Sequence, residues 1–366
     1  MTEMLARTPL YDWHVAHGGR MVDFAGWSMP VQYASIVSEH QATRTGAGLF
    51  DISHMGRLRF DGAEAADFLD RLTTRRVSDL KPGRIRYSLV TNEAGGILDD
   101  VLVYRLQDAA DQPYFVVVVN ASNRKKILDW LRPRLAEAPD VHLTDVTRDW
   151  AMIAVQGPRA LGLAQPLLDA DLASMKYYTG CEVAIDGHGG IVSRTGYTGE
   201  DGCELIVGAK AAPGIWQRLI DAGAAPAGLG CRDTLRLEAA MPLYGHELSE
   251  QITPFQAGLS FAVDLEGRDF TGRDALAAVA GDANLPQRIG LEFSGKRVPR
   301  EGYAVLDQGK PVGEITSGTF SPTLDKPIAM AYVEPASATV GQGLAVDIRG
   351  RQEAARVVAL PFYKRP

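Results

Sequence analysis

The hydrophobic pattern of the first long stretch of the chain changes its period in a fixed order. A strand-like alternation gives way to a helical spacing near Ala63, which is followed by three further strands and a second helix. The turn between the first two of these later strands is the run Asn92-Glu93-Ala94-Gly95-Gly96. The strands are expected at residues 57–60, 85–91, 97–106 and 115–119, and the second helix carries Ile127, Trp130 and Leu131.

A second stretch repeats this order. Residues 151–155 form a strand, and Gly157-Pro158 opens a helix whose core positions are Leu161, Leu167 and Leu168. Strands are expected next at residues 181–185, 190–194 and 204–207, and a helix then carries Ile215, Trp216, Leu219 and Ile220. Because both stretches follow the order β-α-β-β-β-α, we predict a duplicated α+β unit.

The pattern changes again from about Gln287. Short alternating segments are separated there by Gly, Pro, Asp and Ser turns, which predicts an all-β domain, a small barrel or sandwich. The segments are 289–293, 303–306, 311–315, 328–333, 344–348 and 355–360, and residues 282–286 are the expected linker.

Composition is that of an ordinary globular protein of 366 residues, with 46 % apolar residues, 23 % charged residues and a net charge of −7. This mild negative charge gives no reason to expect nucleic acid or a membrane as a partner. The widely spaced Cys181, Cys203 and Cys231 fit a reducing compartment. The N-terminal residues resemble neither a secretory signal nor a transit peptide, so a cytoplasmic location is expected.

Common catalytic signatures are missing from the sequence. There is no Walker loop, no His-Glu-x-x-His and no Gly-x-Ser-x-Gly, and Gly228-Leu229-Gly230 lacks the third glycine of a dinucleotide fingerprint. The seven histidines do not cluster at metal-ligand spacing. Metal, nicotinamide and nucleophilic-serine chemistry are therefore disfavoured.

The segment Gly95–Tyr104 combines a glycine turn with an apolar strand that carries two adjacent acids. A period of two places Asp100 and Tyr104 on one face of the strand and Asp99 on the other. A carboxylate and a phenol in one row would suit a flat heteroaromatic ligand with amines. From spacing alone, we favour the alternative that both acids are merely turn residues.

Two further runs are unusual. In residues 193–205, glycine-bounded turns flank Tyr197, and Glu204 opens an apolar strand. The buried Glu204 carboxylate would need a hydrogen-bond partner, which could be a ligand with two parallel donors or, alternatively, Arg194 or a backbone amide. In residues 228–238 the pattern is helical from Arg232. We expect Arg236 to be structural, whereas Arg232, beside a glycine loop, is better placed to hold an anionic group.

These three runs resemble the glycine cleavage T-protein family of folate-dependent aminomethyltransferases. The similarity extends in the family's order from about Thr8 to Tyr363, nearly the whole chain. Further matching stretches are residues 21–27 (MVDFAGW), 50–55 (FDISHM), 243–247 (LYGHE) and 313–322 (GEITSGTFSP).

The resemblance implies an α+β fold with three domains in a cloverleaf around a central folate cavity. Two domains would be ferredoxin-like, and the third would be a C-terminal β-barrel-like domain. The folate-binding region would cover residues 1–281, with one subdomain at about 48–140 and the other at 1–47 plus 141–281. The all-β domain would cover residues 287–366.

The implied reaction releases ammonia from an aminomethyl group on the lipoyl arm of H-protein. The one-carbon unit passes to tetrahydrofolate as co-substrate, without a metal, and gives 5,10-methylenetetrahydrofolate. The alternative within the same fold is a folate-dependent demethylase of a sulfonium or N-methyl amine. A paralogue that assists iron–sulfur cluster maturation carries a Lys-Gly-Cys-x-x-Gly-Gln-Glu signature that this sequence lacks.

The resemblance also assigns residues. Asp100 would be the catalytic acid that orients the cofactor and stabilises a developing cation. Glu204 would grip the pterin, and Arg232 would line the central channel. The implied pocket wall consists of Met55, Tyr87, Tyr104, Val118, Tyr178 and Tyr197.

One position departs from the family pattern. Glu182 stands where some relatives carry a basic residue beside the folate tail. Lys176, or Lys364 with Arg365, would then have to supply the positive charge for the tail carboxylates.

Overall fold

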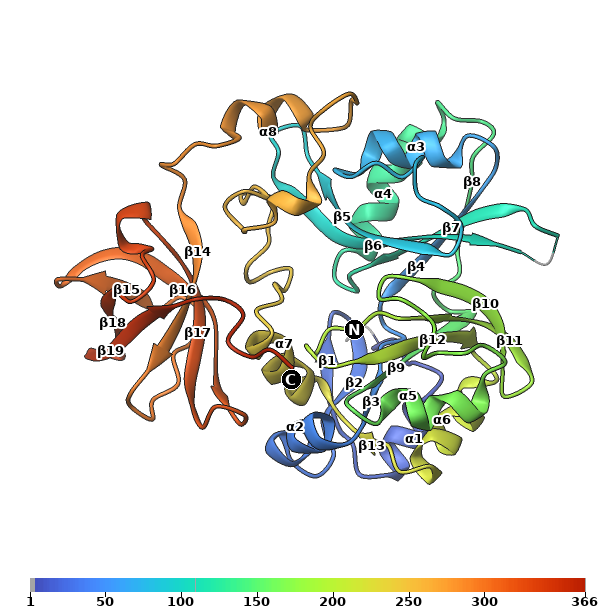
Figure 1. Ribbon diagram of the computed structural model, residues 1–366, viewed down its shortest axis with the longest axis horizontal. Helices are drawn as coiled ribbons and strands as arrows, with labels where there is room; N and C mark the ends of the chain where they lie inside the picture. The colour runs from blue at the N-terminus through green and yellow to red at the C-terminus, as the bar shows by residue number, and fades with distance from the viewer. Residues whose placement is uncertain (1–3, 109, 366) are drawn as a thin grey trace. The chain divides into compact units, whose positions relative to one another are not determined.

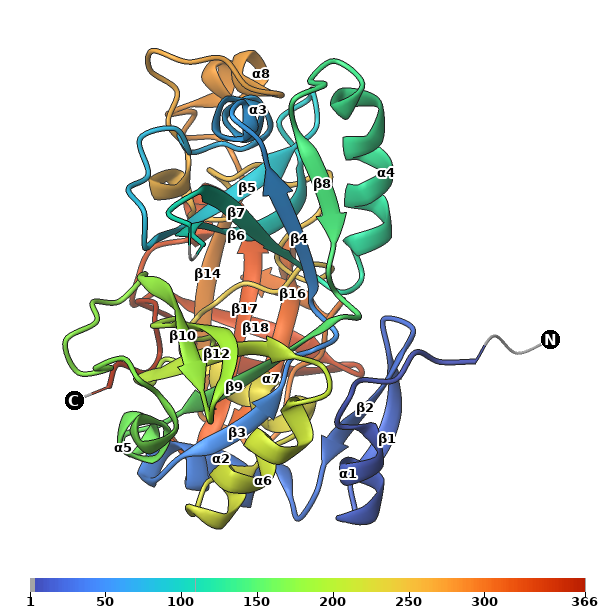
Figure 2. The same ribbon diagram turned by 90° about the vertical axis from the view of Figure 1, so that its right-hand side faces the viewer.

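The computed structural model describes residues 4–108 and 110–365 of the chain (Figures 1 and 2). These residues form two compact units. The first contains the residues up to Val90 together with Asp99–Gly196 and Glu200–Arg232. The second contains Thr91–Leu98, Tyr197–Gly199 and the chain from Asp233 onward.

The first sheet of unit 1 is formed by the first predicted repeat. Its strand order is β5-β6-β7-β4-β8, and the pairings between β4, β6, β7 and β8 are antiparallel. Phe68, Leu69 and Leu72 of the intervening helix are buried, as the helical spacing predicts. The elements are β4 (Gly56–Asp61), α3 (Ala65–Leu72), β5 (Arg84–Thr91), β6 (Ile97–Gln107), β7 (Pro113–Val119), α4 (Arg124–Leu135) and β8 (His142–Asp145).

The second sheet contains the second predicted repeat, in the order β10-β11-β12-β9-β3-β13. Its core includes Trp216, Leu205 and Ile153, all fully buried. The elements are β3 (Gly48–Asp51), β9 (Trp150–Gln156), α5 (Ala160–Ala164), η1 (Gln165–Leu167), β10 (Gly180–Ile185), β11 (His188–Ser193), β12 (Gly202–Gly208), α6 (Ala212–Asp221) and β13 (Ala225–Pro226).

The two sheets share one topology. The order β6-β7-β4-β8 is the strand order 2-3-1-4 of a ferredoxin-like βαββαβ unit, and β5 extends its edge. The second sheet has the same order, except that β3 lies between β9 and the final strand β13. The predicted duplication is therefore confirmed. The place of Gly48–Asp51 in the second sheet is decided by strand pairing, which no local pattern reveals.

The helix expected to begin at Gly157-Pro158 is shorter than its apolar spacing predicts. It ends as an α-helix at Ala164 and continues as a 3₁₀ turn to Leu167. Pro166 explains the break, because proline lacks a backbone N–H and disfavours the α conformation of the residue before it.

The N-terminal elements of unit 1 were not predicted from the hydrophobic pattern. They are α1 (Tyr11–Ala16), β1 (Arg20–Phe24), β2 (Trp27–Gln32) and α2 (Ile36–Thr45). The β1–β2 hairpin turns at Ala25 and Gly26, both with positive φ, and the Asp23 carboxylate accepts a hydrogen bond from the Gly26 N–H at 3.0 Å. Ser35 caps α2 by accepting a hydrogen bond from the Ser38 N–H.

Unit 2 contains a closed barrel with the strand order β14-β17-β16-β15-β18-β19. Its interior is apolar and includes Leu291, Val305 and Ile315, all fully buried. The barrel confirms the predicted C-terminal β domain, although β16 continues through a bulge well beyond the expected segment. The strands are β14 (Gln287–Phe293), β15 (Ala304–Asp307), β16 (Lys310–Ser321), β17 (Lys326–Val333), β18 (Gly343–Ile348) and β19 (Arg351–Val358).

The remaining short elements lie before the barrel or between its strands. They are α7 (Leu229–Glu238), η2 (Ser260–Ala262), α8 (Arg273–Val279) and η3 (Pro335–Ser337). The predicted linker at residues 282–286 falls between α8 and β14. Among the described residues, no helix is long and apolar enough to cross a membrane.

Candidate functional site

Strand β6 carries two adjacent carboxylates, and its neighbours supply their hydrogen-bond donors. Asp99 is fully buried and accepts hydrogen bonds from the backbone N–H of Asn120 (3.0 Å), from the Asn120 amide (2.8 Å) and from the Asn123 amide (2.7 Å). The same Asn120 nitrogen donates to Asp100 Oδ1 at 2.7 Å. Asn120 and Asn123 therefore hold this acidic pair at the end of β7.

Asp100 also has a partner on β5. The Tyr87 hydroxyl donates to Asp100 Oδ2 across 3.2 Å. Both aspartates lie within β6, which begins at Ile97, and not in the glycine turn before it, so the interpretation that they are merely turn residues is wrong. Asp100 remains partly exposed, whereas Asp99 does not.

Burial makes both carboxylates harder to ionise. It raises the pKa of Asp99, and the negative charge of Asp100 raises it further, although the hydrogen bonds from Asn123 and Asn120 oppose the shift. Burial also raises the pKa of Asp100, against the hydrogen bonds from Asn120 and Tyr87. The pair therefore titrates closer to neutral pH than ordinary aspartates do, as perturbed functional carboxylates often do.

Glu204 is a second buried carboxylate in unit 1. It lies on β12 with 4 % of its surface exposed and accepts a hydrogen bond from the Thr195 hydroxyl at 2.5 Å. Burial raises the pKa of Glu204, while Thr195 and the positive charge of Arg232 lower it. Arg194 instead pairs with Asp201 at 2.6 Å, so the alternative that Arg194 satisfies Glu204 is wrong.

Two of the predicted tyrosines lie near this carboxylate. Tyr104 of β6 is fully buried, and its hydroxyl is 3.4 Å from that of Ser193. Burial and the charge of Glu204 raise the pKa values of both Tyr104 and Tyr178. Tyr178 precedes β10 with a φ of 60°. Glu204 and two phenols therefore share one region of unit 1.

The other predicted residues occupy different positions. Val118 of β7 is paired with Leu102 of β6. The positive charge of Arg232 lowers the pKa values of both Glu204 and the buried His54. The Met55 carbonyl accepts a hydrogen bond from Arg57 at 2.6 Å. Tyr197 belongs to unit 2, where its hydroxyl donates to the Pro242 carbonyl at 2.6 Å.

Sequence reasoning missed the polar residues that hold the carboxylates. These are Asn120 and Asn123 beside the aspartates, and Ser193 and Thr195 beside Glu204. A signal for the asparagines existed, because the run Asn120-Ala121-Ser122-Asn123 directly follows the apolar strand that was predicted. No comparable signal marks Ser193 and Thr195.

The stretch of residues 50–55 contains a buried polar network. Asp51 accepts a hydrogen bond from His14 Nε2 at 2.9 Å, and the Tyr33 hydroxyl lies 2.7 Å from His14 Nδ1. Burial alone would raise the pKa of Asp51, but the hydrogen bond and charge of His14 lower it to about 2. Burial lowers the pKa of His54 to about 4. This network ties α1 to β3.

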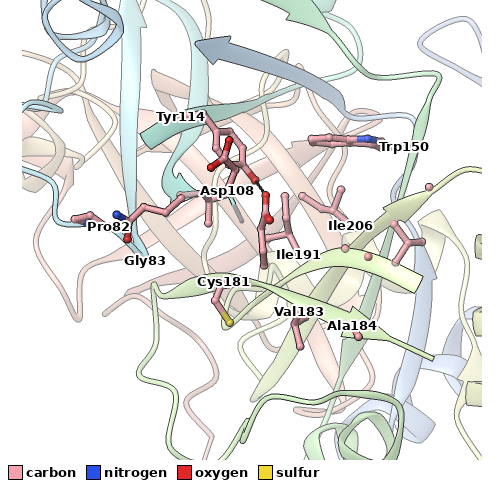
Figure 3. A pocket seen from close by; sticks show the side chains of 18 of the residues that line it. Pro82, Gly83, Asp108, Tyr114, Trp150, Cys181, Val183, Ala184, Ile191 and Ile206 are labelled. Atoms are coloured by element: carbon pink, nitrogen blue, oxygen red, sulfur yellow. Dashed lines mark hydrogen bonds between the residues drawn. The ribbon is translucent and has the colours of Figure 1, made fainter. Parts of the chain in front are cut away.

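A cleft of about 730 Å³ lies in unit 1 (Figure 3). Leu106 of β6 and Ile206 of β12 line it, each two residues beyond Tyr104 and Glu204 on the same strand. Glu182, the position that departs from the family pattern, also lines it and accepts a hydrogen bond from Tyr114. None of the predicted site residues lines this cleft.

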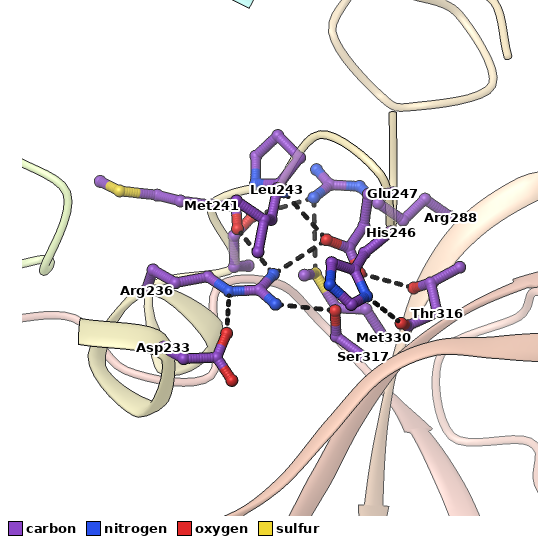
Figure 4. A network of polar contacts seen from close by, with 12 residues as sticks. Asp233, Arg236, Met241, Leu243, His246, Glu247, Arg288, Thr316, Ser317 and Met330 are labelled. Atoms are coloured by element: carbon purple, nitrogen blue, oxygen red, sulfur yellow. Dashed lines mark hydrogen bonds and ion pairs between the residues drawn. The ribbon is translucent and has the colours of Figure 1, made fainter. Parts of the chain in front are cut away.

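Arg236 has the structural role that its helical position predicts, and Figure 4 shows its surroundings in unit 2. It is almost fully buried and contacts Glu247 and Asp233, each at 2.8 Å, and the Ser317 hydroxyl at 2.8 Å. Glu238 instead accepts hydrogen bonds from Ser321 and Thr323. Burial opposes ionisation of Arg236, but the negative charge of Glu247 raises the pKa of the guanidinium. The positive charge of Arg236 in turn lowers the pKa of Glu247, against the effect of burial.

Comparison with known proteins gives the family. The GCVT N-terminal domain family matches residues 10–267, and the glycine cleavage T-protein C-terminal barrel domain family matches residues 287–364. The chain therefore belongs to the glycine cleavage T-protein family, as its sequence predicts.

Full-length relatives agree with this result. An aminomethyltransferase of Streptomyces coelicolor is 51 % identical over 99 % of this chain and 98 % of the relative, and one of Rubrobacter xylanophilus is 50 % identical over 99 % and 95 %. The crystal structure of the glycine cleavage system aminomethyltransferase T of Bartonella henselae matches with a TM-score of 0.92 and 33 % identity, over 99 % of both chains.

Proposed function

We propose that this chain releases ammonia from an aminomethyl group on the lipoyl arm of H-protein and transfers the one-carbon unit to tetrahydrofolate. By its family and its full-length relatives, the chain is an aminomethyltransferase of the glycine cleavage system. The product is 5,10-methylenetetrahydrofolate, and the reaction takes place in the cytoplasm. Tetrahydrofolate, when bound, supplies the amine nitrogens that accept the one-carbon unit.

The single observation that carries this proposal is the setting of Asp100. Its carboxylate is held by Asn120 on one side and by Tyr87 on the other, yet the side chain remains partly exposed. An ionised carboxylate with a fixed orientation and little surrounding water stabilises a nearby cation strongly. We assign Asp100 to the positive charge that develops as ammonia leaves, and to orienting the accepting amines.

The other residues fit a flat, hydrogen-bonding co-substrate. Glu204 is a buried acceptor suited to paired N–H donors of a pterin, and desolvation strengthens such a contact. Tyrosine rings offer flat apolar faces for stacking. We assign this wall to Tyr87, Tyr104, Tyr178 and Tyr197, with Met55 and Val118, and we assign Arg232 to the channel beside Glu204.

We propose the domain boundaries in the same way. The folate-binding region is assigned to residues 1–281, divided into about 48–140 and 1–47 plus 141–281, and the β domain to residues 287–366. The separate family matches at 10–267 and 287–364 support the division before Gln287.

The direct test mixes the purified chain with aminomethyl-loaded, lipoylated H-protein and tetrahydrofolate. Stoichiometric formation of ammonia and 5,10-methylenetetrahydrofolate is expected. A parallel reaction offers sulfonium and N-methyl amine donors instead. Transfer from those donors and none from H-protein would replace this proposal with the demethylase alternative.

A further inference from the structure

We propose that Thr195 and Ser193 are positioning residues that fix one oxygen of Glu204 and thereby aim the other oxygen at the folate. This inference rests on the proposed function. Thr195 Oγ1 lies 2.5 Å from Glu204 Oε2, Ser193 Oγ lies 2.7 Å from Thr195 Oγ1, and the Tyr104 hydroxyl lies 3.4 Å from Ser193 Oγ. All four side chains belong to unit 1 and are at least nine-tenths buried.

The direction of this hydroxyl chain follows from counting hydrogens. A hydroxyl has one hydrogen to donate, and Thr195 gives its hydrogen to the carboxylate of Glu204. Thr195 can then accept from Ser193 at 2.7 Å, and Ser193 in turn can accept from Tyr104. The Glu204 backbone carbonyl, at 3.4 Å from the Ser193 hydroxyl, is the more distant competing acceptor for the Ser193 hydrogen. Each donor polarises the next one, so the chain is directed toward the negative charge of Glu204.

The consequence for Glu204 is geometric. Among the described residues, only Thr195 donates to its carboxylate, and the contact is to Oε2. A carboxylate buried to this degree needs further donors, because unsatisfied buried acceptors are costly. Oε1 is therefore the atom available to a ligand N–H group, and the contact to Oε2 sets the rotation of the carboxylate plane.

The surrounding titratable groups make this contact measurable. Glu204 is influenced by Arg232, and its own charge acts on Tyr104, Tyr178 and the buried thiol of Cys203. Burial raises the pKa of Glu204, and the Thr195 hydrogen bond lowers it. Loss of the Thr195 hydroxyl should therefore raise the pKa of Glu204. Folate binding that needs the ionised carboxylate would then be lost at a higher pH when the solution is acidified.

A purely structural role is the competing explanation. Ser193 and Thr195 also connect β6 with β11 and with the turn after it, so their hydroxyls could serve only to hold the two sheets together. Such a role would change stability without changing the pH dependence of folate binding. The two explanations are therefore separated by a binding titration over a range of pH.

The experiment measures tetrahydrofolate binding by calorimetry from pH 5 to pH 8 for the full chain and three main variants. Thr195→Val keeps the shape but removes the hydroxyl, Thr195→Ser restores it, and Ser193→Ala removes the second link. Thr73→Val is the matched control, because Thr73 is a buried threonine of unit 1 that donates to the Leu69 carbonyl at 2.8 Å.

Thr195→Val should raise the Kd about tenfold, as expected for loss of a hydrogen bond to a charged group, and should move the acid limb of binding to higher pH. Thr195→Ser should stay within about twofold of the unchanged chain, and Ser193→Ala should show a smaller loss in the same direction. The Thr73→Val control should change neither quantity. If Thr195→Val does not fold, as circular dichroism would reveal, Ser193→Ala decides.

The outcomes distinguish the two proposals. Tetrahydrofolate binding with the same Kd and pH profile in the unchanged chain, in Thr195→Val and in Ser193→Ala would overturn the inference alone. Absence of binding by the unchanged chain would overturn the proposed function, and this inference with it.

Discussion

The side-chain nitrogen of Asn120 lies 2.7 Å from Oδ1 of Asp100 and reaches it from the end of the neighbouring strand β7. The same nitrogen is 2.8 Å from Asp99, so one amide fixes two adjacent carboxylates. The orientation of Asp100 is therefore set by a residue distant in the sequence, and the effect of its charge can be tested separately from the effect of its position.

Asp100→Asn should leave the fold intact and lower kcat by about 100-fold or more, because an amide cannot stabilise a developing positive charge. The introduced asparagine side chain still offers one oxygen acceptor at this position, so the affinity for tetrahydrofolate should change little. The measurement is the rate of 5,10-methylenetetrahydrofolate formation at saturating H-protein. Asp61→Asn, on the nearby strand β4, is the control and should keep full activity. Turnover by Asp100→Asn near the unchanged rate would contradict the catalytic assignment.

Tyr87→Phe should shift the pH dependence of the reaction. Asp100 must be ionised to act, so activity is lost as pH falls through its pKa, which burial has raised. The Tyr87 hydrogen bond lowers this pKa, and its removal should move the acid limb of kcat upward by about one pH unit. Tyr11→Phe is the matched control. An unchanged or downward-shifted acid limb in Tyr87→Phe would refute the role of this contact.

Glu204→Ala should weaken tetrahydrofolate binding by about 1–3 kcal/mol, because the ligand donors lose their acceptor. Glu137→Ala removes an exposed carboxylate of unit 1 just after α4, outside the assigned site, so this variant should bind with unchanged affinity. Isothermal calorimetry with both variants gives the comparison. Equal affinities for the two variants would remove Glu204 from the pterin pocket.

Glu247→Gln should destabilise unit 2 by about 3–5 kcal/mol, because the buried charge of Arg236 would lose its buried anionic partner. Asp233→Asn breaks the other ion pair of Arg236, but Asp233 is half exposed, so its loss should cost about 0–1 kcal/mol. Urea denaturation of the full chain measures both effects. Similar midpoints for the two variants would show that the Arg236–Glu247 pair is not the stabilising contact.

Much of the secondary structure was predictable because local periodicity reflects which face of an element is buried. The alternation in residues 97–106 and the apolar run at 115–119 predicted β6 and β7 to within a few residues. The N-terminal hairpin was missed, because its strands are partly exposed and carry no clear alternation.

The candidate site was predictable only in part. The sequence pointed to Asp100 and Glu204 as unusual carboxylates within apolar strands, and the family resemblance supplied their proposed roles. Their hydrogen-bond partners Asn120 and Thr195 were not predicted, because each contact depends on which strands become neighbours and in what register.

The sequence by itself determined the repeated order of strands and helices, the all-β character after Gln287 and the family. These features follow from residue spacing along the chain and from motifs. Only the tertiary structure decided that β3 lies between β9 and β13, that Asp99 and Asp100 are held by Asn120, and that Arg194 pairs with Asp201 instead of Glu204. Such contacts join residues distant in sequence. Their geometry is set only when the strands pair and the polar side chains become buried away from water.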